Sequence, residues 1–176
     1  MFDKLIEVIV EFIDKIIPFV IIQGYNKGVL FRFGIPKKVL NPGIHFKIPF
    51  FDAVDERTVI TTTLSIPEQS LTTFDQKEIV VKAVVKYNIN DIWKNVLNIY
   101  DPVDAISDTT QAVIKEQVTK RTFPECSDNE MDNEITKKVR LQVKNWGIDI
   151  EKVTLTDNGK IKSLRIFTGN SPFSLS

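Results

Sequence analysis

The chain has very little cysteine and histidine and no excess of either charge. Cys126 is its one cysteine and His45 its one histidine among 176 residues. A single cysteine cannot form an internal disulfide, a single histidine excludes a histidine-rich metal site, and a Ser-His-Asp triad could form only through His45. Lys and Arg together number 23, as do Asp and Glu, so the basic excess that is typical of nucleic-acid-binding proteins is missing. The composition therefore predicts no binding to nucleic acid.

Motifs for catalysis and for cofactor binding are also missing. Gly24, Gly28 and Gly34 have the wrong spacing for a phosphate-binding loop, and they lead into strands. The acidic residues between Glu125 and Glu134 fall at the start of a helix, where negative side chains complement the helix dipole, and they lack the glycine of a calcium loop. We therefore predict that the protein is not an enzyme, with no catalytic residues, no cofactor and no metal site.

The patterns that are present predict an α+β fold. Three strand candidates come after residue 58, at residues 59–66, 69–74 and 79–87. Three runs with helical spacing follow, at residues 91–100, 102–121 and 127–146. Pro67 is expected to end the first strand, and Gly147 to end the last helix before a closing strand at 148–155. The prediction is an antiparallel β-sheet packed with two to three helices and preceded by an N-terminal amphipathic helix.

The first 17 residues are expected to form that helix, with a very wide apolar face. Its charged residues all project within an arc of about 120° at about 100° per residue. Charge in every turn up to Lys15 disfavours a straight membrane span, and a signal peptide would need a basic start and a small-residue cleavage site. Two alternatives stay open, a helix in the plane of the membrane interface or a helix packed against its own domain or sister subunits. The residues expected to anchor the chain in a membrane are Phe2, Leu5, Ile6, Ile9, Phe12, Ile13, Ile16, Ile17, Phe19 and Ile21.

Residues 29–48 are expected to form a β-hairpin at the base of this anchor. The second run, 44–48, alternates apolar and polar residues, which predicts Ile44 and Phe46 on a buried face. Residues 41–43, Asn-Pro-Gly, have the composition of a type II turn, in which the glycine takes a positive φ. The segment offers no reactive group, but several of its residues and of those just after it are expected near the membrane or a neighbour: Phe31, Phe33, Pro42, Gly43, Phe46, Pro49, Phe50 and Phe51.

Three short motifs, which follow one another in a specific order, indicate a resemblance to a known protein family. The run GVLFRFG at 28–34 is followed by NPGIHFKIPF at 41–50, and WGIDI occurs late in the chain at 146–150. Each run alone is a weak signal, but their order and spacing are specific. Over most of its length, from about Phe19 to Leu155, the chain resembles the stomatin/prohibitin/flotillin superfamily, also called the SPFH or band 7 domain. Relatives usually continue into a long coiled-coil helix, so the short segment at 159–176 is expected to make this a minimal member.

The resemblance implies a non-catalytic, membrane-associated scaffold that homo-oligomerises into a large ring or cage. Such a scaffold organises a patch of membrane or modulates membrane proteins, for example a membrane protease. It implies a peripheral or monotopic protein with its domain on the cytoplasmic side. The expected organisation is an anchor or packing helix at 1–22, an SPFH-like domain at 23–158 and a short tail at 159–176. The alternative is a soluble structural ring or a virion-associated oligomer whose N-terminal helix packs between subunits.

Overall fold

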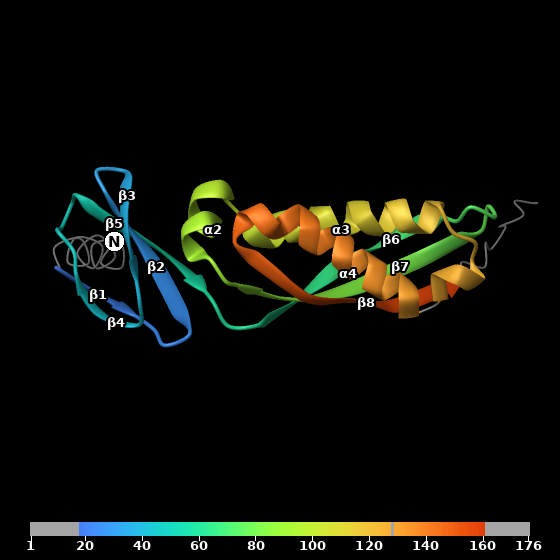
Figure 1. The fold of residues 1–176 in the computed structure, drawn as a ribbon, viewed down its shortest axis with the longest axis horizontal. Helices are drawn as coiled ribbons and strands as arrows, with labels where there is room; N and C mark the ends of the chain where they lie inside the picture. Colours follow the sequence, from blue (N-terminus) through green and yellow to red (C-terminus); the bar gives the residue numbers. More distant parts are fainter. Residues whose placement is uncertain (1–17, 128, 161–176) are drawn as a thin grey trace, which may run out of the picture.

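The chain folds into two parts that lie end to end. The computed structural model describes residues 18–127 and 129–160, and Figure 1 shows them as an elongated molecule. A small all-β part from residues 19–58 lies at one end, and a sheet covered by helices lies at the other. Antiparallel sheets packed with helices confirm the predicted α+β class. The N-terminal helix expected for residues 1–17 lies outside the described residues.

The large part is an antiparallel sheet of three long strands with helices on one face. The strands, in their spatial order, are β6 (Thr62–Thr72), β7 (Glu78–Ile89) and β8 (Ile148–Lys160). Every second residue of β7 is buried, because α3 (Pro102–Thr119) and α4 (Asn129–Val143) cover one face of the sheet, as Figure 1 shows. Two 3-10 helices, η1 (Pro124–Ser127) and η2 (Lys144–Trp146), flank α4. The strand predicted for residues 79–87 is thus confirmed, and its alternating burial marks the face of the sheet that the helices cover.

Pro67 does not end a strand, contrary to the prediction. β6 runs through it, and its pairing with β7 shifts register between Ile66 and Gln69. β6 is an edge strand, so a proline without an N–H and the extra residue are accommodated there as a bulge. The two strand candidates on either side of Pro67 are therefore one strand.

The small part consists of a three-stranded sheet and a two-stranded ribbon. The strands are β1 (Phe19–Ile22), β2 (Asn26–Arg32), β3 (Ile35–Leu40), β4 (Gly43–Phe46) and β5 (Asp52–Thr58). β2 lies between β3 and β5, while β1 and β4 pair with each other and form what we call the β1–β4 ribbon. Ile22 of the ribbon packs on Leu30 and Leu40 of the sheet, so one face of the ribbon is buried.

The hairpin predicted for residues 29–48 is wrong in its pairing. β2 turns directly into β3 at Phe33 and Gly34, whose φ angles of 53° and 75° are both positive, as a type I′ turn requires. β4 pairs with β1 instead. Ile44 and Phe46 consequently point outward and are 71% and 61% exposed, where the alternation predicted burial. Alternation identifies a strand but not its buried side, and here the partner strand places the apolar residues on the outside.

A tight junction joins the two parts. In helix α2 (Ile92–Asn98), Ile92 shares a buried cluster with Val29 of β2. Gly147 ends the turn before β8 with a φ of 70°, as predicted, and its carbonyl accepts a hydrogen bond from the Asp91 N–H. A Cβ atom at Gly147 would lie 2.1 Å from the Asp91 carbonyl oxygen, so only glycine fits. This junction fixes the direction in which the small part projects.

Candidate functional site

Several exposed apolar residues belong to the free end of the small part. This end lies at the left of Figure 1. This end holds the start of β1, the end of β4, the β2–β3 turn and the loop that leads into β5. Backbone hydrogen bonds hold these segments together: the Lys47 N–H donates to the Pro18 carbonyl, and the Phe33 N–H donates to the Phe51 carbonyl. We call this surface the apolar tip, and its exposed residues are Phe19, Phe33, Ile35, Phe46, Phe50 and Phe51.

The outer face of the β1–β4 ribbon extends the apolar tip. Ile21 is paired with Ile44 and Phe19 with Phe46, and all four side chains are exposed. The rings of Phe19 and Phe46 lie edge to face with their centroids 5.9 Å apart. Ile22 faces the other way, into the core, so the ribbon is apolar on both of its faces. Contiguous apolar surface of this kind marks a site of contact with a membrane or another protein.

Two phenylalanines of the apolar tip occupy positions that the backbone disfavours. Phe33 and Phe50 have φ angles of 53° and 67°, in a region where a side chain costs about 1–2 kcal/mol relative to glycine. Their side chains are also 69% and 70% exposed, so core packing does not offset that cost. The ring centroid of Phe33 lies 4.9 Å from that of Phe51, but both residues stay exposed, so this contact within the domain offsets little of the cost. The two phenylalanines therefore point to a contact outside the domain.

An ion pair holds the loop of the apolar tip in place. Arg32 donates from Nε and Nη2 to the two carboxylate oxygens of Asp52, at 2.7 and 2.9 Å, and the Ile48 N–H donates to the same carboxylate at 2.8 Å. The hydrogen bonds from Arg32 and then from Ile48 lower the pKa of Asp52 to about 2. The carboxylate is therefore charged at neutral pH, and it ties residues 48–51 to the ends of β2 and β5.

Five of the residues singled out in and just after the predicted hairpin lie in or beside the apolar tip. Phe33, Phe46, Phe50 and Phe51 are exposed there, and Pro49 is half-buried in the same loop. The prediction did not include Ile35, because nothing in the sequence distinguishes an exposed isoleucine at the start of a strand from a buried one. Recognising the tight turn at Phe33 and Gly34, just before it, would have placed Ile35 at the end of the molecule.

The remaining hairpin residues, Pro42, Gly43 and Phe31, lie outside the apolar tip. Pro42 and Gly43 are exposed at the opposite end of β4, and Gly43 has the positive φ expected of it, 134°. Phe31 is half-buried in the cluster that joins the two parts. Phe19 and Ile21, which we assigned to the anchor, belong to β1. The other anchor residues fall outside the described part of the chain: Phe2, Leu5, Ile6, Ile9, Phe12, Ile13, Ile16 and Ile17.

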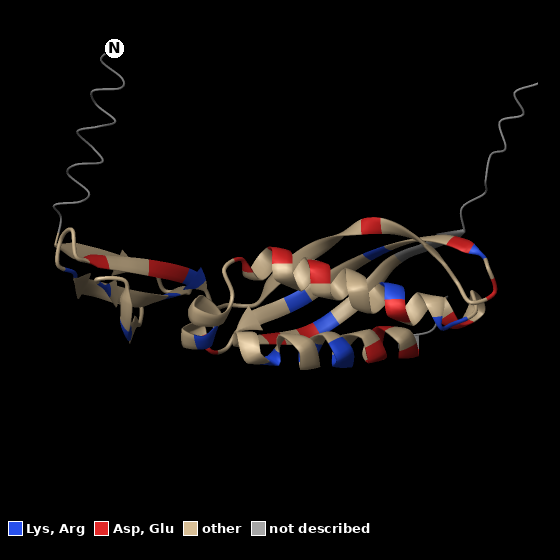
Figure 2. Cartoon of the chain, turned by 90° about the horizontal axis from the view of Figure 1, so that it is seen from above, with Lys and Arg blue, Asp and Glu red and all other residues tan. Residues whose placement is uncertain are grey.

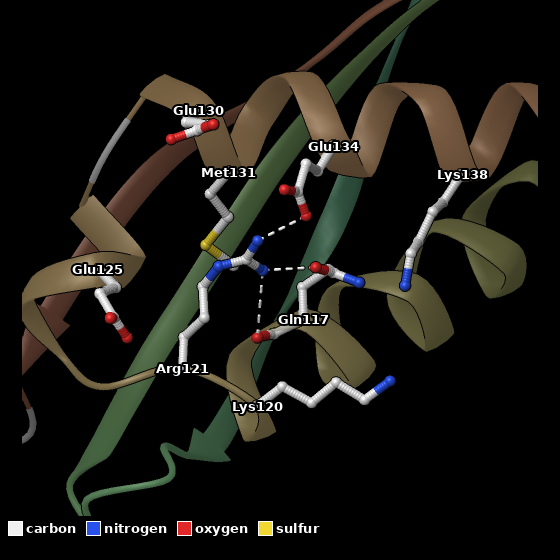
Figure 3. Close-up of a pocket in the computed structure, with 8 residues that line it drawn as sticks. All are labelled: Gln117, Lys120, Arg121, Glu125, Glu130, Met131, Glu134 and Lys138. Carbon is white, nitrogen blue, oxygen red and sulfur yellow. Dashed lines mark hydrogen bonds and ion pairs between the residues drawn. The ribbon is translucent and has the colours of Figure 1, made fainter.

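An open cleft of about 570 Å³ lies between the end of α3 and the start of α4 (Figure 3). Arg121 pairs with Glu134 at 2.6 Å, and the two lysines that line the cleft, Lys120 and Lys138, both pair with Glu116. Those lysines lower the pKa of Glu116 to about 2. Each basic residue lining the described cleft thus already has an acidic partner. The Arg121–Glu134 and Lys138–Glu116 pairs join the end of α3 to α4 and so stabilise the packing of the two helices.

A second open cleft, of about 480 Å³, lies where the two parts meet. Its Asp101 caps α3 by accepting hydrogen bonds from backbone N–H groups, and its Arg57 donates to the Asp55 carboxylate. Burial, and then the nearby Asp101, raise the pKa of Tyr87, so this hydroxyl is protonated at neutral pH. Within the described ranges, no group of three or more His, Cys, Asp or Glu side chains is placed to hold a metal ion.

The model of the SPFH domain / Band 7 family matches residues 20–159. This chain belongs to the SPFH domain / Band 7 family. The match runs from β1 to the end of β8 and so includes both parts of the fold. It confirms the resemblance carried by the three sequence motifs.

Similar proteins occur in an archaeon, an animal and a virus. An uncharacterized protein of Methanocaldococcus jannaschii is 31% identical over 143 residues, which cover 78% of this chain and 70% of that protein. Stomatin-1 of Caenorhabditis elegans is 26% identical over 140 residues, 78% of this chain and 42% of Stomatin-1. A putative band 7 family protein of Acanthamoeba polyphaga mimivirus is 24% identical over 137 residues, 77% of this chain and 45% of the viral protein. The chain thus spans less than half the length of the last two relatives.

Membership in this SPFH / Band 7 family supports a membrane-associated scaffold role in general. Family members are generally scaffolds rather than enzymes, and the likeness to stomatins supports oligomerisation in general. Across residues 18–127 and 129–160, the helices are too short or too polar for any of them to cross a bilayer.

Proposed function

We propose that this SPFH protein is a membrane-peripheral scaffold that homo-oligomerises and organises a patch of membrane. The observation that carries the proposal is the apolar tip, with Phe33 and Phe50 exposed on a backbone that disfavours them. Burying such side chains in lipid is favourable by about 25 cal/mol per Å² of apolar surface. Pro18 lies at the same end, so residues 1–17 join the domain where the apolar tip would meet the membrane.

Assembly into a ring is the second part of the proposal. The likeness to stomatins supports oligomerisation in general, and β6 and β8 each have one edge without a partner strand in the described part of the chain. Such edges are surfaces to which a neighbouring subunit can add. In this arrangement the apolar tips of all subunits face one membrane, on its cytoplasmic side, and the large parts stand away from it.

Flotation of the full-length protein with phosphatidylcholine vesicles tests the membrane contact. The double variant Phe19→Ser with Phe46→Ser removes an exposed ring pair from the outer face of the β1–β4 ribbon. A control variant, Tyr100→Ser with Leu141→Ser, removes two apolar side chains from the large part that are more exposed than Phe19 and Phe46. We expect the control to float like the wild type and the tip variant to float less. Equal flotation of both variants would remove the apolar tip from the proposal, and no flotation of the wild type would overturn the membrane contact.

A truncation that starts at Pro18 separates the scaffold from the soluble alternative. It leaves β1 whole, whereas a start at Gln23 would delete Ile22 and uncover Leu30 and Leu40. If the protein is a soluble ring held by its N-terminal helix, light scattering should show the truncated oligomer falling apart without lipid or detergent. For a membrane scaffold we expect weaker flotation, with the remaining binding carried by the apolar tip.

A further inference from the structure

A run without acidic residues surrounds the apolar tip. Residues 18–51 contain five basic residues and no Asp or Glu, although the net charge of the whole chain is zero. Arg32 is neutralised by Asp52, the first acidic residue after the run. The other four basic residues have no acidic partner within 4.0 Å among the described residues: Lys27, Lys37, Lys38 and Lys47. The acidic residues of the small part, red in Figure 2, all belong to β5. The free end of this part therefore combines an apolar surface with an excess of basic residues.

Three of these lysines lie close enough to the apolar tip to meet lipid headgroups when the tip contacts a membrane. Lys47 is in the apolar tip itself, where its N–H donates to the Pro18 carbonyl. Lys37 and Lys38 are exposed in β3, two and three residues beyond Ile35, which places them about 7 and 10 Å along the strand. The polar region on each side of a bilayer is about 5–8 Å thick, and lysine side chains extend toward it while their stems lie on apolar surface. With the aromatic rings at the hydrocarbon boundary, flexible lysine side chains at these distances can reach the level of the phosphates.

We infer that the apolar tip selects anionic phospholipids through Lys37, Lys38 and Lys47. The inference rests on the proposed membrane contact and adds the class of lipid. Each lysine near an anionic surface raises partitioning about fivefold, so the three together are expected to contribute roughly 100-fold. The preference weakens with salt, because charges are screened beyond about 8 Å at physiological ionic strength. Lys27 lies farther from the apolar tip, opposite Arg57 in the β2–β5 pairing, and is not part of the site.

Binding of the full-length protein to two kinds of vesicle tests the inference, one of phosphatidylcholine and one that also contains phosphatidylglycerol. The variant K37Q/K38Q/K47Q should bind phosphatidylcholine like the wild type but lose most of the gain on anionic vesicles. A control, K115Q/K137Q/K144Q, removes three exposed lysines of the large part and should keep that gain. Urea denaturation of each variant checks that the fold is retained.

Four results decide the matter. A wild-type gain on anionic vesicles that salt reduces and that only the tip variant loses supports the inference. Equal wild-type binding to both vesicles overturns it while leaving the proposed membrane contact intact. An equal loss in the tip and control variants also overturns it, because the effect then follows net charge and not the apolar tip. Wild-type protein that binds neither vesicle overturns the proposed membrane contact itself.

Discussion

Replacing Phe50 by asparagine should weaken membrane binding without weakening the fold. Asparagine tolerates the left-handed φ of 67° better than phenylalanine, so the free energy of unfolding should stay unchanged or rise by about 0.5–1 kcal/mol. Full burial of a phenylalanine side chain is worth about 1.5–3 kcal/mol. The side chain is 70% exposed, so about 1–2 kcal/mol is available on insertion into lipid, which is roughly a 5- to 30-fold change in partitioning.

Vesicle partitioning and urea denaturation measure the two effects of this change separately. Phe74→Asn is the matched control, since Phe74 is 72% exposed but lies in the turn between β6 and β7, at the opposite end of the molecule. Its replacement should leave partitioning unchanged. A loss of more than about 1 kcal/mol of unfolding free energy in Phe50→Asn would show that this ring packs within the fold. Unchanged partitioning of that variant would refute insertion of the apolar tip.

Two further predictions concern the elements that position the apolar tip. Because Arg32 lowers the pKa of Asp52 to about 2, from an ordinary value of 3.8, the stabilisation by this pair should be complete above about pH 4 and lost as the pH falls toward 2. The difference in unfolding free energy between wild type and Asp52→Asn should therefore shrink over that window, and a constant difference would contradict the assignment. At the junction, Gly147→Ala would place a Cβ atom against the Asp91 carbonyl at a positive φ and should destabilise the fold by about 3 kcal/mol or more. Gly24→Ala, which meets nothing within 4 Å, should change stability by less than about 0.5 kcal/mol, and similar losses in both variants would argue against the steric account.

Local signals predicted the large part of the fold well. The alternation in β7 marks one buried face because neighbouring strand residues point to opposite sides and the helices cover only one of them. Gly147 was predicted to end a helix and does so with a left-handed φ. Pro67 misled the prediction because its effect depends on whether the strand is at an edge of the sheet, which no local pattern records.

Strand pairing in the small part could not be predicted from local signals. β4 lies close in sequence to β3 but pairs with β1, and the choice depends on the core that Ile22, Leu30 and Leu40 form together. The apolar tip was predicted only in part for the same reason. Phe33 and Phe50 were named as available to face lipid, yet their positive φ angles, which make the case for an external contact, follow from turns whose geometry the tertiary fold sets.

Acidic residues are scarce around the apolar tip, and this scarcity strengthens the case for an external partner there. In the large part, where acidic and basic residues are mixed, some lysines have a carboxylate within 4.0 Å, among them Lys77, Lys86, Lys120 and Lys138. Around the apolar tip Arg32 is paired, but the described neighbours provide no carboxylate within that distance for Lys37, Lys38 or Lys47. The Arg32–Asp52 pair holds the loop, so its charges are used within the fold. Lys38 acts on the Asp52 carboxylate only at longer range, and none of Lys37, Lys38 and Lys47 forms an ion pair within the described chain, so an anionic membrane surface would give these three ammonium groups a close partner.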